Sequence, residues 1–170
     1  MAKELLSIQD IKELNDLLRQ VFRYITNLKS TYRLADKIKY PQIPSILSES
    51  LVIHLLKRNI LPELSRYNFS FGGKKADILA KINREELKIE VKATAKNAFE
   101  YFGGKDITAD YIFWVHFGEF YLNSKDKIVE IYIIKNPHTY FKNPVKITLS
   151  KLRGIIGNNL KKTEVDINSL

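Results

Sequence analysis

The sequence of 170 residues predicts a mixed α/β (α+β) domain in which helices flank a mixed central sheet. Three patterns lead to this prediction. Apolar residues recur at helical spacing over residues 7–29, and apolar and polar residues alternate over residues 77–92 as they do in half-buried strands. Residues 111–117 form a nearly continuous apolar and aromatic run, which is typical of a fully buried strand.

The other elements follow from local breaks in the chain. Pro41 and Pro44 end a short segment over residues 31–39, and Pro44-Ser45 marks the start of a second helix. Gly72-Gly73 indicates a turn, and Gly103-Gly104 favours a loop over residues 95–110. We therefore expect helices over 7–29 and 45–59, strands over 67–71, 77–82, 87–92, 111–117 and 128–134, and a late helix or turn over 149–156.

Length and composition indicate one domain, with an N-terminal helical extension over residues 1–44, a core over 45–135 and a C-terminal extension over 136–170. The absence of cysteine excludes disulfides and thiol chemistry, and with only three scattered histidines it disfavours a zinc site. No apolar run approaches membrane-spanning length and no signal-peptide pattern opens the chain. A cytoplasmic protein without a membrane partner is the simplest expectation.

The chain is strongly basic, with 28 Lys and Arg against 19 Asp and Glu, a net charge of +9 and a pI near 9.6. A basic surface gains affinity for a phosphate backbone by releasing counterions and steers diffusion toward it. A lysine-rich composition can also be basic without binding nucleic acid. The charge therefore favours a nucleic-acid partner without specifying DNA or RNA.

The segment from Asp77 to Lys92 carries most of the functional information. A symmetric turn over residues 83–86 would place Asp77 opposite Lys92 and Leu79 opposite Glu90. Asp77, Glu90 and Lys92 would then project from one face of the sheet, with the backbones of the two acids about 7–8 Å apart. Both carboxylates could reach one cation, since the oxygen ligands of Mg²⁺ lie at about 2.1 Å. A turn of odd length would flip one strand and destroy this arrangement.

An acid on one strand followed by Glu90-Val91-Lys92 on the next resembles the signature of the PD-(D/E)XK nuclease superfamily. The resemblance covers residues 45–117, and Ala76 stands where the family often has proline. It implies the αβββαβ core of restriction endonucleases, with Asp77, Glu90 and Lys92 as catalytic residues. The alternative is a solvated hairpin with a surface Asp77–Lys92 pair that stabilises little.

The resemblance also implies a cofactor and a mechanism. Asp77 and Glu90 would bind Mg²⁺, which polarises the phosphate and lowers the pKa of a bound water. Lys92 would orient or deprotonate that water, or stabilise the pentavalent phosphate. No nucleotide cofactor is expected, because residues 72–75 lack the spacing and hydroxyl of a P-loop.

Glu49 is a further candidate for the catalytic and metal site. It lies on a helical stripe with Ile53, Leu56 and Ile60, so it points along a core-facing side. The family often places a glutamate on the helix before its first core strand, which implies a metal-site role for Glu49. The alternative is that an acid in the first helical turn merely complements the helix dipole.

Within the superfamily, the small chain with extensions on both sides of the core indicates a type II restriction endonuclease, which cuts double-stranded DNA at a short sequence. Cutting both strands of a symmetric site implies a homodimer, with the N-terminal helix as dimer surface or as a cover for the sheet. Residues that could contact DNA, or simply be solvated, are Lys96, Asn97, Lys105, Arg153 and Lys161. The alternatives are a structure-selective nuclease (a junction resolvase or repair nuclease) and a non-catalytic basic DNA-binding protein on the same fold.

Overall fold

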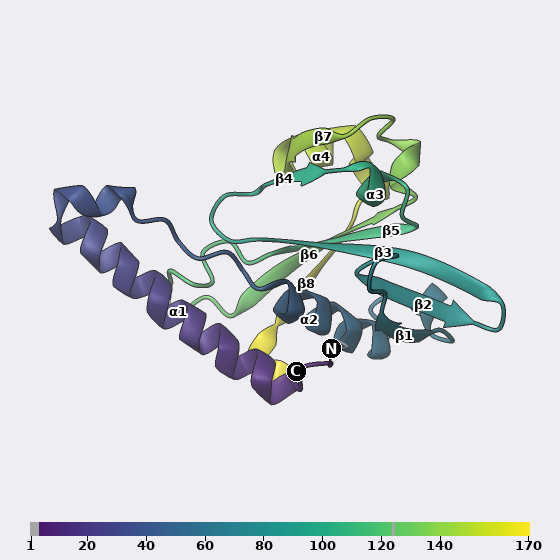
Figure 1. Cartoon of the computed structure of the whole chain (residues 1–170), viewed down its shortest axis with the longest axis horizontal. Helices are drawn as coiled ribbons and strands as arrows, with labels where there is room; N and C mark the ends of the chain where they lie inside the picture. Colours follow the sequence, from purple (N-terminus) through teal and green to yellow (C-terminus); the bar gives the residue numbers. More distant parts are fainter. Residues whose placement is uncertain (1–3, 124) are drawn as a thin grey trace.

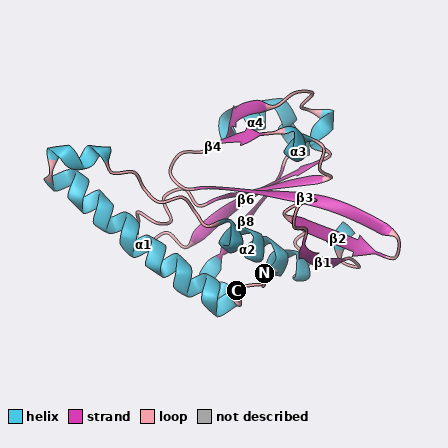
Figure 2. Cartoon of the chain, in the orientation of Figure 1, coloured by secondary structure: helices cyan, strands magenta, loops and turns pink. Residues whose placement is uncertain are grey.

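The computed structural model describes residues 4–123 and 125–170, and it has the predicted α+β fold. Its main sheet has six strands in the order β1-β2-β3-β5-β6-β8, with helices on both faces (Figure 1). Strands β4 and β7 form a separate two-stranded sheet above it (Figure 2). In the part of the chain that the structure describes, no helix is long and apolar enough to cross a membrane.

The first half of the main sheet carries the predicted hairpin. Strands β1 (Asn68–Phe71), β2 (Ile78–Ile82) and β3 (Glu85–Thr94) form an antiparallel meander. Strand β5 (Tyr111–His116) pairs with β3 in parallel, and β6 (Ile128–Lys135) and β8 (Lys161–Asp166) continue the sheet in antiparallel order. A parallel neighbour needs a crossover, so the chain must leave the sheet between β3 and β5.

That crossover differs from the loop predicted over residues 95–110. It contains strand β4 (Phe99–Phe102) and the one-turn helix α3 (Gly104–Ile107). Strand β4 pairs with β7 (Val145–Thr148), a segment some 40 residues further along the chain. Local sequence gave little sign of this pairing, because each strand has only four residues and finds its partner through the tertiary fold.

The predicted helices are present and divide between the two faces. Helix α1 (Ile8–Thr31) begins at a capping box in which the Ser7 side chain accepts from the Asp10 amide and Asp10 accepts from the Ser7 amide. Helix α2 (Ser45–Lys57) packs with α1 on one face of the sheet, and α4 (Leu149–Ile156) lies with α3 on the other (Figure 1).

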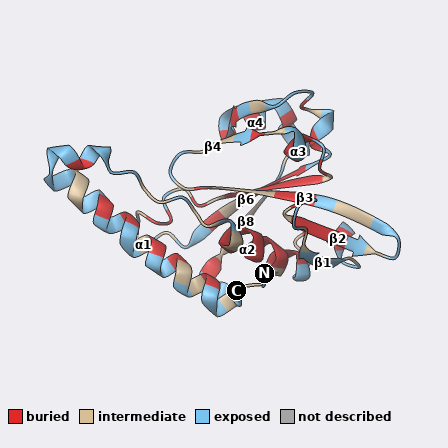
Figure 3. Cartoon of the chain, in the orientation of Figure 1, coloured by how far each residue is buried: buried red, intermediate tan, exposed pale blue. Residues whose placement is uncertain are grey.

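Two hydrophobic clusters fill the spaces between sheet and helices, because successive residues of a strand point to opposite faces. Ile89 and Phe113 belong to the cluster under α1 and α2, whereas Ile112 and Trp114 belong to the cluster under α4. Helix α2 is almost entirely buried (Figure 3). On β3, Glu90 pairs with Ile112 of β5 and Lys92 pairs with Trp114 of β5. Paired residues share a sheet face, so Glu90 and Lys92 face the side of α3 and α4.

The C-terminal residues are more ordered into the sheet than a basic tail would be. Residues 161–166 form β8, which pairs with β6 as an edge strand. Lys162 on this strand forms ion pairs with Glu130 at 2.6 Å and Glu164 at 3.0 Å. Strand β8 was not predicted, since its polar sequence has only Val165 buried and its pairing is non-local.

The hairpin register differs from the predicted one by two residues. Ile82 pairs with Glu85 and Ile78 with Ile89, so the turn consists of residues 83 and 84 alone. Leu79 therefore lies opposite Lys88 rather than Glu90, and continuing the ladder by one residue places Asp77 opposite Glu90 rather than Lys92. A shift of two keeps every side chain on its predicted face, because strand side chains alternate with a period of two.

Asn83 fixes this short turn through its left-handed backbone, with φ at 52°. We predict that Asn83→Ala lowers the free energy of unfolding by about 1 kcal/mol, because alanine strains at positive φ where asparagine does not. Asn83→Gly should keep the wild-type stability within about 0.5 kcal/mol, and so should Arg84→Ala at the neighbouring position. Urea unfolding of the four proteins measures these differences; equal midpoints for Asn83→Ala and wild type would contradict the role of Asn83.

Candidate active site

The turn between β1 and β2 fixes the start of the site. A side chain on Gly72 would lie 2.4 Å from the Ala76 carbonyl oxygen, so only glycine fits this turn. The Gly72 amide donates to the Asp77 carbonyl at 3.0 Å, which sets the backbone of Asp77 directly before β2. The Asp77 side chain then accepts a hydrogen bond from the Val91 amide at 2.8 Å. Its carboxylate is thus held beside the part of β3 that extends past the ladder with β2, whose pair at this end is Ile78 with Ile89.

Glu90 places a second carboxylate beside Asp77. Its side chain is 4% exposed, and one cationic group lies at both acids: the Lys105 ammonium is 3.3 Å from Glu90 Oε1 and 3.8 Å from Asp77 Oδ1. Glu90 Oε1 is buried and makes no hydrogen bond to any residue that the structure describes. The two predicted metal ligands therefore converge on one position, and one of their oxygens lacks a hydrogen-bond donor there.

The environment of Glu90 disfavours its ionised form. Burial and, to a smaller extent, the negative charge of Asp77 raise the pKa of Glu90, the positive charge of Lys105 offsets part of this increase, and the resulting pKa is about 7. A carboxylate with a raised pKa beside a second acid is typical of functional sites, although structural networks also produce it.

Lys92 lies on the same face and pairs with an acid that the sequence analysis missed. Its ammonium is 2.9 Å from Asp106 Oδ1, and Asp106 Oδ2 accepts from the Gly103 amide at 2.7 Å. Glu100 on β4 is a second missed acid; burial raises its pKa, and the charge of Lys92 partly offsets the increase. An aspartate three residues after Gly103 resembles a helix N-terminal pattern, and this was the available signal for Asp106.

Thr94 anchors the end of the Glu90–Lys92 strand. Its hydroxyl accepts from the Trp114 indole nitrogen at 2.8 Å and lies 2.9 Å from His116 Nδ1. Burial lowers the pKa of His116, which favours the neutral imidazole. Thr94 is buried with Trp114, so this contact ties β3 to β5 one pleat beyond Lys92.

Glu49 is not brought into the carboxylate pair. It is buried on α2, which packs against the sheet face opposite to the one that Glu90 and Lys92 occupy. In residues 4–123 and 125–170 no three acids or histidines form a group suited to hold a metal ion, so the predicted three-ligand set is not assembled. Glu49 nonetheless has an interaction partner within the chain.

The predicted DNA contacts fall in three places. Lys105 is in the site itself, and Lys96 and Asn97 line a groove of about 730 Å³ that also includes Glu100 and therefore adjoins the site. Arg153 and Lys161 lie elsewhere: Arg153 donates to the Tyr132 hydroxyl, and Lys161 donates to the Ile60 carbonyl at 3.1 Å. Their positive groups thus serve contacts within the fold.

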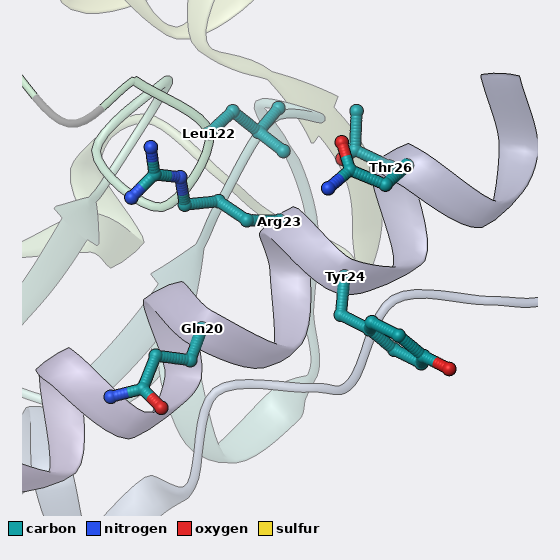
Figure 4. A pocket seen from close by; sticks show the side chains of 6 residues that line it. Gln20, Arg23, Tyr24, Thr26 and Leu122 are labelled. Atoms are coloured by element: carbon teal, nitrogen blue, oxygen red, sulfur yellow. The ribbon is translucent and has the colours of Figure 1, made fainter.

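A second hollow of about 580 Å³ lies between α1 and Leu122 (Figure 4). Arg23 extends from α1 below Leu122 in this view, and Tyr24 points away from Leu122 (Figure 4). The described residues that line it include no acid or histidine, so they offer no carboxylate or imidazole as a metal ligand or general base. The carboxylate pair remains the better candidate for chemistry.

The arrangement can hold a divalent cation. Mg²⁺ in proteins typically takes one or two carboxylates and completes its shell with water and substrate oxygens. Asp77 and Glu90 provide such a pair, and a metal would satisfy the buried Glu90 oxygen that lacks a hydrogen bond. Lys92, on the same face of β3 as Glu90, would supply a positive group beside the metal.

The raised pKa of Glu90 predicts a pH dependence of stability. Between its ordinary pKa of 4.5 and its value of about 7 in the fold, the native state binds more protons than the unfolded state, so stability falls as pH rises through this range. Glutamine does not titrate, so Glu90→Gln should lack this loss. We predict that the free energy of unfolding falls by about 2 kcal/mol more in wild type than in Glu90→Gln between pH 5 and pH 8. Denaturant unfolding at both pH values measures this; the surface variant Glu119→Gln should show no such difference.

No protein-family model, curated protein or solved structure matches this chain. The carboxylate pair, its lysines and the sheet that carries them are therefore the basis for assigning a function.

Proposed function

We propose that this protein is a Mg²⁺-dependent endonuclease that hydrolyses phosphodiester bonds of double-stranded DNA. The observation that carries the proposal is the convergence of Asp77 and Glu90 on one cationic group, with a buried Glu90 oxygen that makes no hydrogen bond to the described residues. Lys92 projects from the same face of the same strand. Two acids that can hold a divalent cation, with a lysine on the same face, suit metal-assisted phosphodiester hydrolysis.

Each residue would have a distinct role. Asp77 and Glu90 would hold Mg²⁺, whose chemistry when bound would be to polarise the phosphate and activate a water. Lys92 would orient that water or stabilise the negative charge that develops on the attacked phosphate. Asp106 holds the Lys92 ammonium in position through a 2.9 Å ion pair, while its other oxygen is fixed by the Gly103 amide.

The order of the elements supports membership of the PD-(D/E)XK superfamily. Helix α2 precedes the antiparallel strands β1, β2 and β3, and the next strand of the sheet, β5, is parallel to β3. This agrees with the αβββαβ core that the motif implies, except that β4 and the one-turn helix α3 stand in the crossover where the core has its second helix.

The substrate and the assembly are inferred from charge and surface. A net charge of +9 favours a phosphate backbone, and the groove lined by Lys96 and Asn97 adjoins the site. We infer a type II restriction endonuclease acting as a homodimer, since two symmetric cuts need two sites. Helix α1 exposes Leu17, Val21 and Tyr24 at spacings of four and three residues, which supports it as the dimer surface.

The first prediction concerns cleavage. Asp77→Ala, Glu90→Ala and Lys92→Ala should each reduce Mg²⁺-dependent cutting of plasmid DNA by at least about 100-fold, because each removes a metal ligand or the group that assists the water. Lys88→Ala is the matched control for Lys92→Ala, since Lys88 is an exposed lysine on the same face of the same strand. Glu119→Ala controls for loss of an acid.

The pattern of products distinguishes the candidate functions. Discrete fragments of linear plasmid support a restriction enzyme, whereas preference for branched DNA would indicate a structure-selective nuclease. Wild-type cutting by Lys92→Ala would exclude its assigned role. Absence of metal-dependent cutting by the wild-type protein on any of these substrates would reject the nuclease proposal and leave a DNA-binding protein.

The second prediction concerns the salt dependence of DNA binding. Neutralising about 6–10 phosphates should make log affinity fall linearly with log salt, with a slope near −0.9 for each phosphate. Lys96→Ala should reduce this slope by about one unit for each Lys96 in the complex and weaken specific and non-specific binding alike. Fluorescence anisotropy without metal measures both; Lys161→Ala is the control, because its ammonium is engaged by the Ile60 carbonyl. Binding that does not respond to salt would mean that the positive charge is compositional.

A further inference from the structure

Helix α3 presents two neighbouring charges of opposite sign to the candidate site. Lys105 pairs with Glu90 and Asp77, and Asp106 pairs with Lys92. Three of the four predicted catalytic residues, Asp77, Glu90 and Lys92, are therefore ion-paired to one helical turn. The Lys105 ammonium lies at the position on which the two carboxylates converge.

We propose that Lys105 is an internal competitor for the metal: its ammonium occupies the cation position between Asp77 and Glu90, and the divalent ion must displace it. The inference rests on the proposed function, because it assumes that the metal binds at this carboxylate pair. It adds a residue that sets the metal concentration at which the site becomes loaded.

The contacts of Lys105 are those of a group that can leave. Its side chain is 48% exposed, and its ammonium lies 3.3 Å from Glu90 and 3.8 Å from Asp77. Despite this proximity, Glu90 Oε1 receives no hydrogen bond within residues 4–123 and 125–170. The lysine end of this ion pair is half exposed, and its flexible four-carbon stem lets the ammonium turn into solvent. A divalent ion bound to both carboxylates gains more Coulomb energy than a single ammonium at longer range.

The contacts of Asp106 show why α3 stays in place when Lys105 leaves. Asp106 is 5% exposed, and its two oxygens bind the Lys92 ammonium and the Gly103 amide. The next residue, Ile107, is buried in the cluster with Phe102 and Trp114. Displacement therefore requires only rotation of the Lys105 side chain, without movement of the helix.

Without metal, Lys105 partly neutralises the buried Glu90 and the partly buried Asp77. Like charges at short distance repel strongly where water is excluded, so an ammonium here stabilises the empty fold. The same contact must weaken metal binding, since both cations compete for the same oxygens.

The test is metal binding in the absence of DNA. Isothermal titration with Mn²⁺ at about pH 8.5, where Glu90 is ionised, compares wild type with Lys105→Met and Lys105→Gln. Both variants should bind about ten-fold more tightly, because a charge-assisted contact no longer opposes the metal. Lys105→Arg keeps the positive charge and should bind like wild type. Lys88→Met removes the same charge from an exposed position on β3 and should change affinity by less than about two-fold.

Each outcome decides between two ideas. Tighter binding by both neutral Lys105 variants that is lost again on adding Glu90→Gln supports the competition. Equal binding by wild type and the Lys105 variants, still dependent on Glu90, overturns the competition and leaves the proposed function standing. Failure of every variant to bind Mn²⁺ through Glu90 overturns both. Thermal unfolding of each variant establishes that it is folded before titration.

Discussion

The site depends on the burial of Glu90 next to Asp77. Glu90 is 3% exposed, and a buried carboxylate costs free energy unless it is paired, protonated or bound to a cation. Asp77 cannot be the partner of an ionised Glu90, because it is itself a negatively charged acceptor. The fold responds in two ways: the pKa of Glu90 rises to about 7, and α3 delivers the Lys105 ammonium to the pair. Protonation removes the negative charge of Glu90, and the ammonium offsets it. Both effects show that a cation is favoured at this position, which is the physical basis for the proposed metal.

Asp77 shows how the end of a strand can build a site. Strand β2 begins at Ile78, whereas β3 continues to Thr94, so the Val91 amide has no backbone partner on the β2 side. The Asp77 carboxylate accepts that amide hydrogen at 2.8 Å and is thereby fixed beside Glu90. The Gly72 turn, which admits no side chain, sets the backbone that makes this possible.

The crossover between β3 and β5 completes the site and also encloses it. A parallel pair needs a long connection, and here that connection brings Glu100, Lys105 and Asp106 over the face that carries Glu90 and Lys92. Because Phe102 and Ile107 anchor β4 and α3 in the cluster beneath them, the charged residues between these anchors are held over the sheet. The same segment leads to the groove at Lys96 and Asn97.

The sequence by itself determined the fold class, the main helices and strands, and the shared face of Asp77, Glu90 and Lys92. These features follow from local periodicity. The turn has two residues instead of the predicted four, but the resulting register shift of two leaves each side chain on its predicted face. Only the tertiary structure decided the pairings of β4 with β7 and β6 with β8, the separation of Glu49 from the carboxylate pair, and the contacts of Lys105 and Asp106 with the site. These contacts join residues far apart in the chain, and the packing of the two hydrophobic clusters on opposite faces of the sheet brings them together. Such contacts produce no periodic pattern in the sequence.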